Sequence, residues 1–153
     1  MCINVVLADD HPGIRMGVRS IINNTSDICL TGEAADGVRV LELVKELDPD
    51  VLLLDIEMPG MTGIEVAQTL QEEGVDIPIL IYSAYADKSL VTGVLENGAA
   101  GYITKDEVPE MLLTAVRRLA TGDRGLVSRR IADRLSLWFE DQADTNVTVH
   151  PIY

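Results

Sequence analysis

The sequence predicts an α/β domain in which helices cover both faces of a parallel β-sheet. Short apolar runs alternate along the chain with amphipathic stretches, a pattern typical of strands joined by crossover helices. The chain has 153 residues, about the size of one domain, and 47% of them are hydrophobic, enough for a sizeable core. The runs are apolar at nearly every position, as expected for strands that are buried on both sides.

Five strands are expected where β-branched residues and leucines cluster, over 3–7, 28–34, 51–54, 77–82 and 101–103. Apolar residues recur at helical spacing after each strand, which predicts five helices over 14–22, 38–47, 64–70, 90–95 and 111–119. Helix breakers agree with this order: Pro12 stands near a helix start, Pro49 precedes a strand, and Asn97 and Gly98 follow a helix. The chain therefore reads as five βα units in succession.

The chain beyond residue 122 is expected to add one helix. Ser128 is a candidate N-cap, and Ile131, Leu135, Trp138 and Phe139 follow it at helical positions. We expect a main domain over 1–122, a linker or extra helix over 123–139, and a flexible tail over 140–153.

Composition argues against several classes of protein. Twelve basic and 25 acidic residues give a net charge of −13, so direct binding to nucleic acid is not expected. No apolar run approaches the roughly 20 residues of a membrane span, and the N-terminus lacks the pattern of a signal peptide. Cys2 and Cys29 lack metal-ligand spacing, and we expect both to be free thiols of a cytoplasmic protein.

Polar side chains stand where the expected strands end. Asp9 and Asp10 follow the first strand, Asp55 the third, Ser83 the fourth and Lys105 the fifth. The carboxyl ends of parallel strands share one edge of a sheet, so these side chains should lie close together. Clustered carboxylates repel each other unless a cation binds, and Mg²⁺ suits a site with few acids that shares its ligands with phosphoryl oxygens. Because an aspartate can attack phosphorus while a lysine stabilises the transferred group, the cluster predicts phosphoryl acceptance.

The loop DIEMPGMTG at 55–63 resembles the D-x-x-M-P-G-M-x-G signature of response regulator receiver domains. The resemblance covers about residues 3–121 and includes the acids at 9–10, Ser83 and Lys105 in the family's order. DDHP at 9–12 and GAAGYITKD at 98–106 are similar to the branch whose output is a LuxR- or NarL-type helix-turn-helix domain. The resemblance implies a flavodoxin-like, doubly wound sheet of five parallel strands in the order 2-1-3-4-5.

For the metal, the resemblance implies that Asp10 is a direct Mg²⁺ ligand and that Asp9 acts mainly through water. Asp55 would be the phosphoacceptor and a further metal ligand, and Glu57 would offer its backbone carbonyl. The implied phosphoryl donor is a sensor histidine kinase.

For the switch, the resemblance implies that Lys105 contacts the phosphoryl group and that Ser83 donates its hydroxyl to it. Tyr102 would then change rotamer, which makes a two-state switch that controls transcription. The chain is also expected to form a homodimer. It would contact DNA only through an output domain. Only 14 residues follow Phe139, too few for such a domain, so we expect it to be absent from this chain. The chain is then either a receiver fragment of a longer regulator or a stand-alone receiver that acts through protein contact.

Other interpretations remain open at this point. The site could be vestigial in a phosphorylation-independent interaction or dimerisation module. A phosphohydrolase of the haloacid-dehalogenase type would need D-x-D after the first strand, where this chain has Asp9-Asp10. His11 is expected to form local hydrogen bonds or be exposed, and Arg15 and Arg19 are expected on a solvated helix face without a role.

Overall fold

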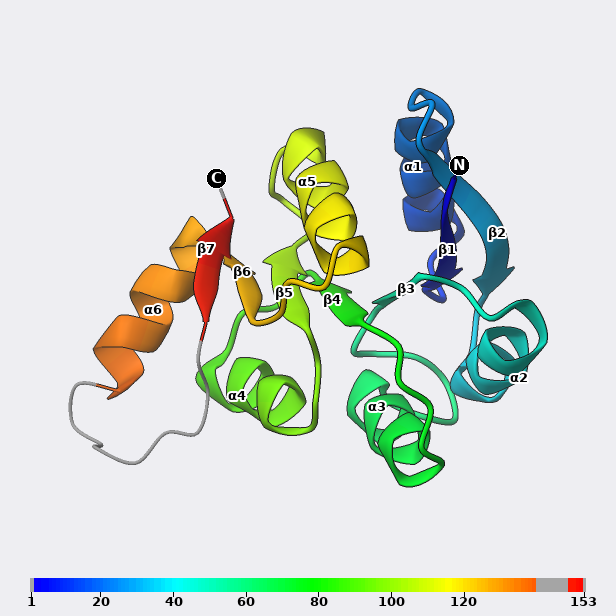
Figure 1. The fold of residues 1–153 in the computed structure, drawn as a ribbon. Helices are drawn as coiled ribbons and strands as arrows, with labels where there is room; N and C mark the ends of the chain where they lie inside the picture. The colour runs from blue at the N-terminus through cyan, green and yellow to red at the C-terminus, as the bar shows by residue number, and fades with distance from the viewer. Residues whose placement is uncertain (1, 140–148, 153) are drawn as a thin grey trace.

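A computed structural model describes residues 2–139 and 149–152, without the side chains of Trp138 and Phe139. Its strands form one parallel sheet in the order β2-β1-β3-β4-β5-β6-β7 (Figure 1). The strands are β1 Ile3–Ala8, β2 Ile28–Ala34, β3 Val51–Leu54, β4 Ile79–Ser83, β5 Gly101–Thr104, β6 Leu126–Ser128 and β7 His150–Ile152. The predicted flavodoxin-like order 2-1-3-4-5 is confirmed, and two more strands extend it beyond β5.

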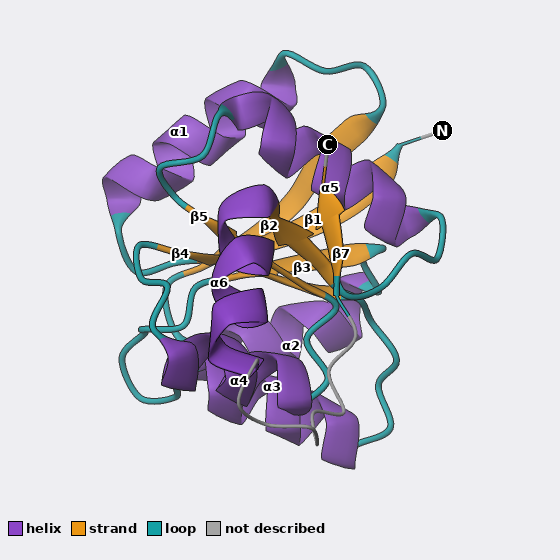
Figure 2. Ribbon diagram, turned by 90° about the vertical axis from the view of Figure 1, so that its left-hand side faces the viewer, coloured by secondary structure: helices purple, strands orange, loops and turns teal. Residues whose placement is uncertain are grey.

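Helices cover both faces of the sheet, as Figure 2 shows. The helices are α1 Pro12–Asn23, α2 Gly37–Leu47, α3 Gly63–Glu72, α4 Lys88–Glu96, α5 Pro109–Ala120 and α6 Arg129–Phe139. Apolar side chains of α1 and α5 pack in one cluster on the sheet, and those of α2, α3, α4 and α6 pack in a second cluster on the opposite face. None of the helices described is long and apolar enough to cross a membrane.

Local chemistry explains several element boundaries. Pro12 stands in the first turn of α1, where a missing N–H costs little. Strand β4 begins at Ile79 rather than at the predicted residue 77, directly after Pro78, which has no N–H to donate to a strand ladder. Gly98 has a φ of 91° just beyond α4, a left-handed conformation that glycine adopts without strain.

The segment after α5 belongs to the same sheet. Strand β6 pairs with β5 through Gly101 and Leu126, and β7 pairs with β6. The prediction of an unstructured tail is therefore wrong for His150–Ile152, and residues 140–148 lie outside the described residues. Both added strands have three residues, too few to show a period in the sequence.

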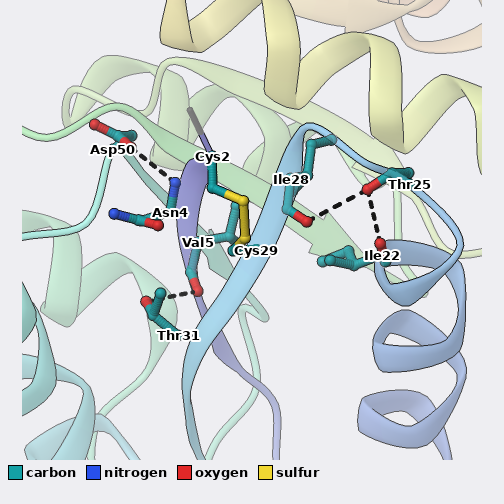
Figure 3. The surroundings of a disulfide bond; sticks show 9 residues. All are labelled: Cys2, Asn4, Val5, Ile22, Thr25, Ile28, Cys29, Thr31 and Asp50. Atoms are coloured by element: carbon teal, nitrogen blue, oxygen red, sulfur yellow. Dashed lines mark hydrogen bonds between the residues drawn. A yellow bond between two sulfur atoms is a disulfide. The ribbon is translucent and has the colours of Figure 1, made fainter.

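The expectation of two free thiols is also wrong, because Cys2 and Cys29 form a disulfide (Figure 3). Strands β1 and β2 are neighbours, and Asn4 pairs with Cys29 in their register. This pairing brings the two Cα atoms to 5.6 Å although the cysteines are 27 positions apart in the sequence, and such a separation suits a disulfide. The bond joins the start of β1 to the edge strand.

Candidate functional site

The site lies at the edge of the sheet where β1, β3, β4 and β5 end. Asp9, Asp55 and Lys105 each stand one position beyond a strand, and Ser83 is the last residue of β4. The backbone N–H of Asp55 donates to Ala8, and that of Lys105 donates to the carbonyl of Ser83, so neighbouring strands fix the start of each loop. Asp9, Asp55 and Ser83 are buried, as expected for side chains that converge on one point.

Carboxylates gather at this edge. Asp9, Asp10, His11 and Asp55 offer ligand atoms that all lie within 4.8 Å of one another. Among the described residues, the buried atoms Asp9 Oδ2 and Asp10 Oδ1 have no hydrogen-bond partner. Asp9 Oδ2 instead forms an ion pair with Lys105, and Asp10 Oδ1 lies 3.1 Å from His11 Nδ1. Carboxylate oxygens clustered in this way fit a hard divalent cation such as Mg²⁺.

Lys105 brings a positive charge into the acidic cluster. Its Nζ lies 2.6 Å from Asp9 Oδ2, as an ion pair rather than an aligned hydrogen bond, and 3.3 Å from Asp55 Oδ2. Burial lowers the pKa of Lys105, but the two carboxylates outweigh burial, so the pKa lies above its ordinary value and the amine stays protonated.

Burial raises the pKa of Asp55 above that of an ordinary carboxyl group. The Lys105 ammonium opposes this rise, and the negative charge of Asp9 adds to it. A carboxylate held in this way is incompletely stabilised as an anion. The Asp55 carboxylate is therefore suited to react as a nucleophile.

The loop after Asp55 is fixed by α3. Thr62 caps this helix, accepting from the backbone of Glu65 in a capping box. Gly63 donates to the carbonyl of Ile56 at 2.6 Å, and a Cβ at position 63 would lie 2.6 Å from the carbonyl oxygen of Asp55. Glycine is therefore required for this approach of helix to loop.

An open pocket of about 370 Å³ lies beside the acids. Its lining residues are Asp10, His11, Glu57, Met58, Pro59 and Thr62. Glu57 itself is exposed. The pocket leaves room for a small molecule next to the carboxylate cluster.

Ser83 and Tyr102 belong to one hydrogen-bonded segment. Tyr85 donates its backbone N–H to Ser83 Oγ at 3.1 Å, and the Tyr102 hydroxyl donates to the carbonyl of Tyr85. Tyr102 is fully buried, and burial raises its pKa to about 12. The two predicted switch residues are thus joined through the β4–α4 loop, and the predicted change of rotamer stays a prediction.

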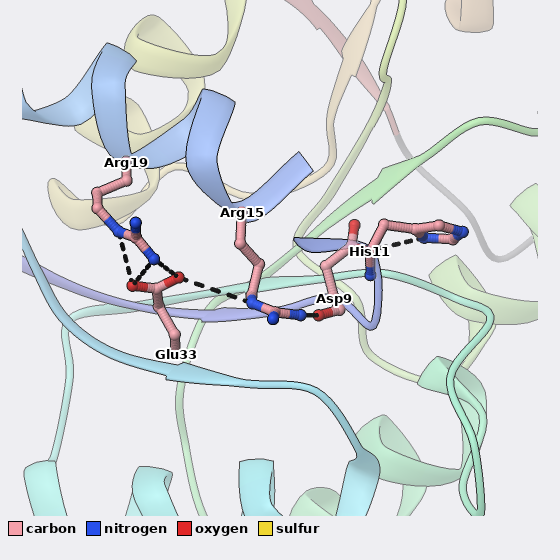
Figure 4. Close-up of polar contacts among 5 residues, drawn as sticks. All are labelled: Asp9, His11, Arg15, Arg19 and Glu33. Atoms are coloured by element: carbon pink, nitrogen blue, oxygen red, sulfur yellow. Dashed lines mark hydrogen bonds and ion pairs between the residues drawn. The ribbon is translucent and has the colours of Figure 1, made fainter. Parts of the chain in front are cut away.

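The turn after β1 is held by Arg15, a residue for which the sequence predicted no role. Arg15 donates to the carbonyl of Asp9 at 2.5 Å, while Arg19 forms a two-point contact with Glu33 of β2 (Figure 4). His11 is exposed and contacts Asp9 through its backbone and its Nδ1, as predicted. The prediction for Arg15 is wrong, because helix α1 starts close enough for its side chain to reach back to the strand end.

Sequence comparison identifies similar proteins. Residues 5–117 match the response regulator receiver domain family. The chain is 41% identical over 119 residues to the nitrate/nitrite response regulator protein NarL of Escherichia coli K12, a match that covers 78% of this chain and 55% of the relative. It is 39% identical over 121 residues to the transcriptional regulatory protein YxjL of Bacillus subtilis, with 79% and 56% covered. The chain thus spans about half the length of these curated relatives.

Solved structures share the fold. The receiver domain of the response regulator NarL from Mycobacterium tuberculosis superposes with a TM-score of 0.76 at 38% identity, covering 79% of this chain and 98% of that one. A LuxR-family response regulator from Aurantimonas sp. SI85-9A1 gives a TM-score of 0.84 at 29% identity, covering 90% and 98%. The latter match extends further into the chain.

Proposed function

Because the chain belongs to the response regulator receiver domain family, we propose that it accepts a phosphoryl group on Asp55 and changes conformation as a result. The observation that supports this most is the buried contact set of Lys105 with Asp9 and Asp55. The Asp55 carboxylate is the nucleophile, and the Lys105 ammonium places a positive charge beside it. Relatives of the NarL type support a role in two-component signalling.

In the proposed reaction, a carboxylate oxygen of Asp55 attacks the phosphorus of a donor. A new O–P bond forms while the bond from phosphorus to the leaving group breaks, and the leaving group keeps the electron pair. Lys105 stabilises the negative charge on the transferred group, and the Ser83 hydroxyl donates to one of its oxygens. The proposed donors are phosphohistidine in a sensor histidine kinase and small acyl phosphates.

Asp10, Asp55 and the carbonyl of Glu57 would hold Mg²⁺, with Asp9 acting through water. The ligand atoms of Asp9, Asp10 and Asp55, which lie within 4.8 Å of one another, support this assignment. The cation would neutralise phosphoryl oxygens as the donor approaches. Control of transcription through an output domain and homodimer formation are further parts of the proposal.

Intact-protein mass spectrometry after incubation with acetyl phosphate tests the proposal. The parent should gain one phosphoryl group with Mg²⁺ and none with a chelator, and Asp55→Asn should gain none in either case. Uptake by the folded Asp55→Asn variant would overturn the assignment of Asp55. A parent that binds Mg²⁺ yet gains no mass would support the phosphorylation-independent interaction module instead.

A further inference from the structure

Helix α6 contacts the β4–α4 loop and the β5–α5 loop, both of which start at the site. Arg130 Nη1 lies 2.5 Å from Asp106 Oδ2, and Asp106 directly follows Lys105. Arg134 donates to the carbonyl of Ala86 at 3.4 Å, in the loop that follows β4. The two arginines are four positions apart and so lie on one side of the helix. That side of α6 is in contact with the segments next to Ser83 and Lys105.

The neighbouring side of α6, about 100° around the helix, packs on the core. Ile131 and Leu135 are buried in the same apolar cluster as Val94 of α4 and Tyr102. The hydroxyl of Ser128 accepts from the backbone of Ile131 at the start of the helix, as its predicted N-cap role requires. The apolar contacts therefore seat the helix, and its arginines reach the loops.

The arginine contacts are weak enough to be broken by a small movement. The side chains of Arg130 and Asp106 are 51% and 63% exposed, and ion pairs with such exposure stabilise little. The bond from Arg134 to Ala86 is already long at 3.4 Å. A shift of either loop by a few tenths of an ångström would weaken these contacts.

The β4–α4 loop provides a route from the site to α6. Ser83 Oγ accepts from the backbone of Tyr85, the next residue is Ala86, and the Ala86 carbonyl accepts from Arg134. The Tyr102 hydroxyl holds the carbonyl of Tyr85 in between. A displacement of Ser83 is thus passed along the backbone to the contact with α6.

The strand order gives this displacement a direction. Asp55 follows β3, while α6 follows β6, and β4 and β5 lie between them (Figure 1). A phosphoryl group on Asp55 adds negative charge and acceptor oxygens, which attract the Ser83 hydroxyl and the Lys105 ammonium. Both loops are then drawn toward β3, which is away from α6.

We propose that α6 responds to phosphorylation of Asp55. The loops after β4 and β5 move away from Arg134 and Arg130, these contacts are lost, and the helix packs less tightly. This inference rests on the proposed function. Since coupling is reciprocal, weakening the arginine contacts favours the phosphorylated conformation.

Hydrogen exchange of α6, measured with intact mass on the same sample, tests the inference. With Mg²⁺ and acetyl phosphate, amides of residues 129–137 in the parent should exchange faster by about two- to fivefold, the scale expected when weak, exposed contacts are lost. Arg134→Gln should exchange faster before phosphorylation and respond less to it. Arg117→Gln is the matched control, because Arg117 pairs with Asp27 away from α6 and should leave the response intact.

The outcomes separate the two proposals. A gain of one phosphoryl group with unchanged or slower exchange in α6 would overturn the inference and leave the proposed function standing. No gain in mass would overturn both. Faster exchange of equal size in Asp55→Asn under the same conditions would also contradict the inference, because the effect would not come from Asp55.

Discussion

The ammonium of Lys105 lies closer to Asp9 than to Asp55, at 2.6 Å against 3.3 Å. Lys105 thus neutralises part of the acidic cluster that would hold a cation. A bound divalent cation and the lysine compete for the same carboxylate. The lysine would be freed toward Asp55 as the cation binds.

Replacing Lys105 by Gln should therefore separate metal binding from phosphoryl transfer. Without the competing charge, Mg²⁺ should bind several-fold more tightly, whereas phosphoryl uptake at saturating Mg²⁺ should fall by about 100-fold or more. Titration calorimetry and the rate of mass gain measure the two effects. The control is Lys88→Gln, which removes the same charge at an exposed position of α4. Weaker Mg²⁺ binding in Lys105→Gln would contradict this account.

Replacing Asp55 by Asn should stabilise the metal-free protein. Burial raises the pKa of Asp55, so its contribution to stability is present below the unfolded-state pKa of about 3.9 and is lost as the pH rises through the folded-state pKa. At pH 7 the ionised carboxylate destabilises the fold, and Asn removes that cost. Urea unfolding with a chelator should show this gain at pH 7 and a smaller gain at pH 4. A less stable variant at pH 7 would count against the burial argument.

Arg15 should be a positioning residue for the metal site. It holds the carbonyl of Asp9 and so the turn that presents Asp10. Arg15→Gln should weaken Mg²⁺ affinity on the order of tenfold, while phosphoryl uptake at saturating Mg²⁺ changes little. Arg19→Gln is the matched control, since Arg19 contacts Glu33 and not Asp9. Equal Mg²⁺ affinities in the two variants would remove this role from Arg15.

Much of the fold followed from the sequence because buried parallel strands and amphipathic helices each have a clear pattern. The acids at 9, 10 and 55 could be predicted as one cluster, because the ends of parallel strands share one edge. Strands β6 and β7 could not be predicted from the sequence, because a strand of three residues is too short to show a hydrophobic period. The disulfide joins positions 27 apart and depends on a distance across the fold that local pattern does not encode. The contact of Arg15 depends on how its side chain turns back to the carbonyl of Asp9, which the helical pattern does not show.

The Cys2–Cys29 disulfide should stabilise the protein by linking β1 to β2. It closes a loop between positions 27 apart, for which the chain-entropy argument gives about 3 to 4 kcal/mol. Unfolding of the oxidised parent should shift to lower urea on adding a reductant, and Cys29→Ser should not respond to the reductant. Two reactive thiols in the unreduced protein would show that the bond is absent.

The central claim is that Asp55 is the residue that carries the phosphoryl group. Borohydride reduction of an aspartyl phosphate yields homoserine, and peptide sequencing by mass spectrometry locates it. After treatment with acetyl phosphate and Mg²⁺, we expect homoserine at position 55 and unmodified aspartate at positions 9 and 10. Homoserine at either of those positions, or none at 55 in protein that has gained a phosphoryl group, would contradict the account.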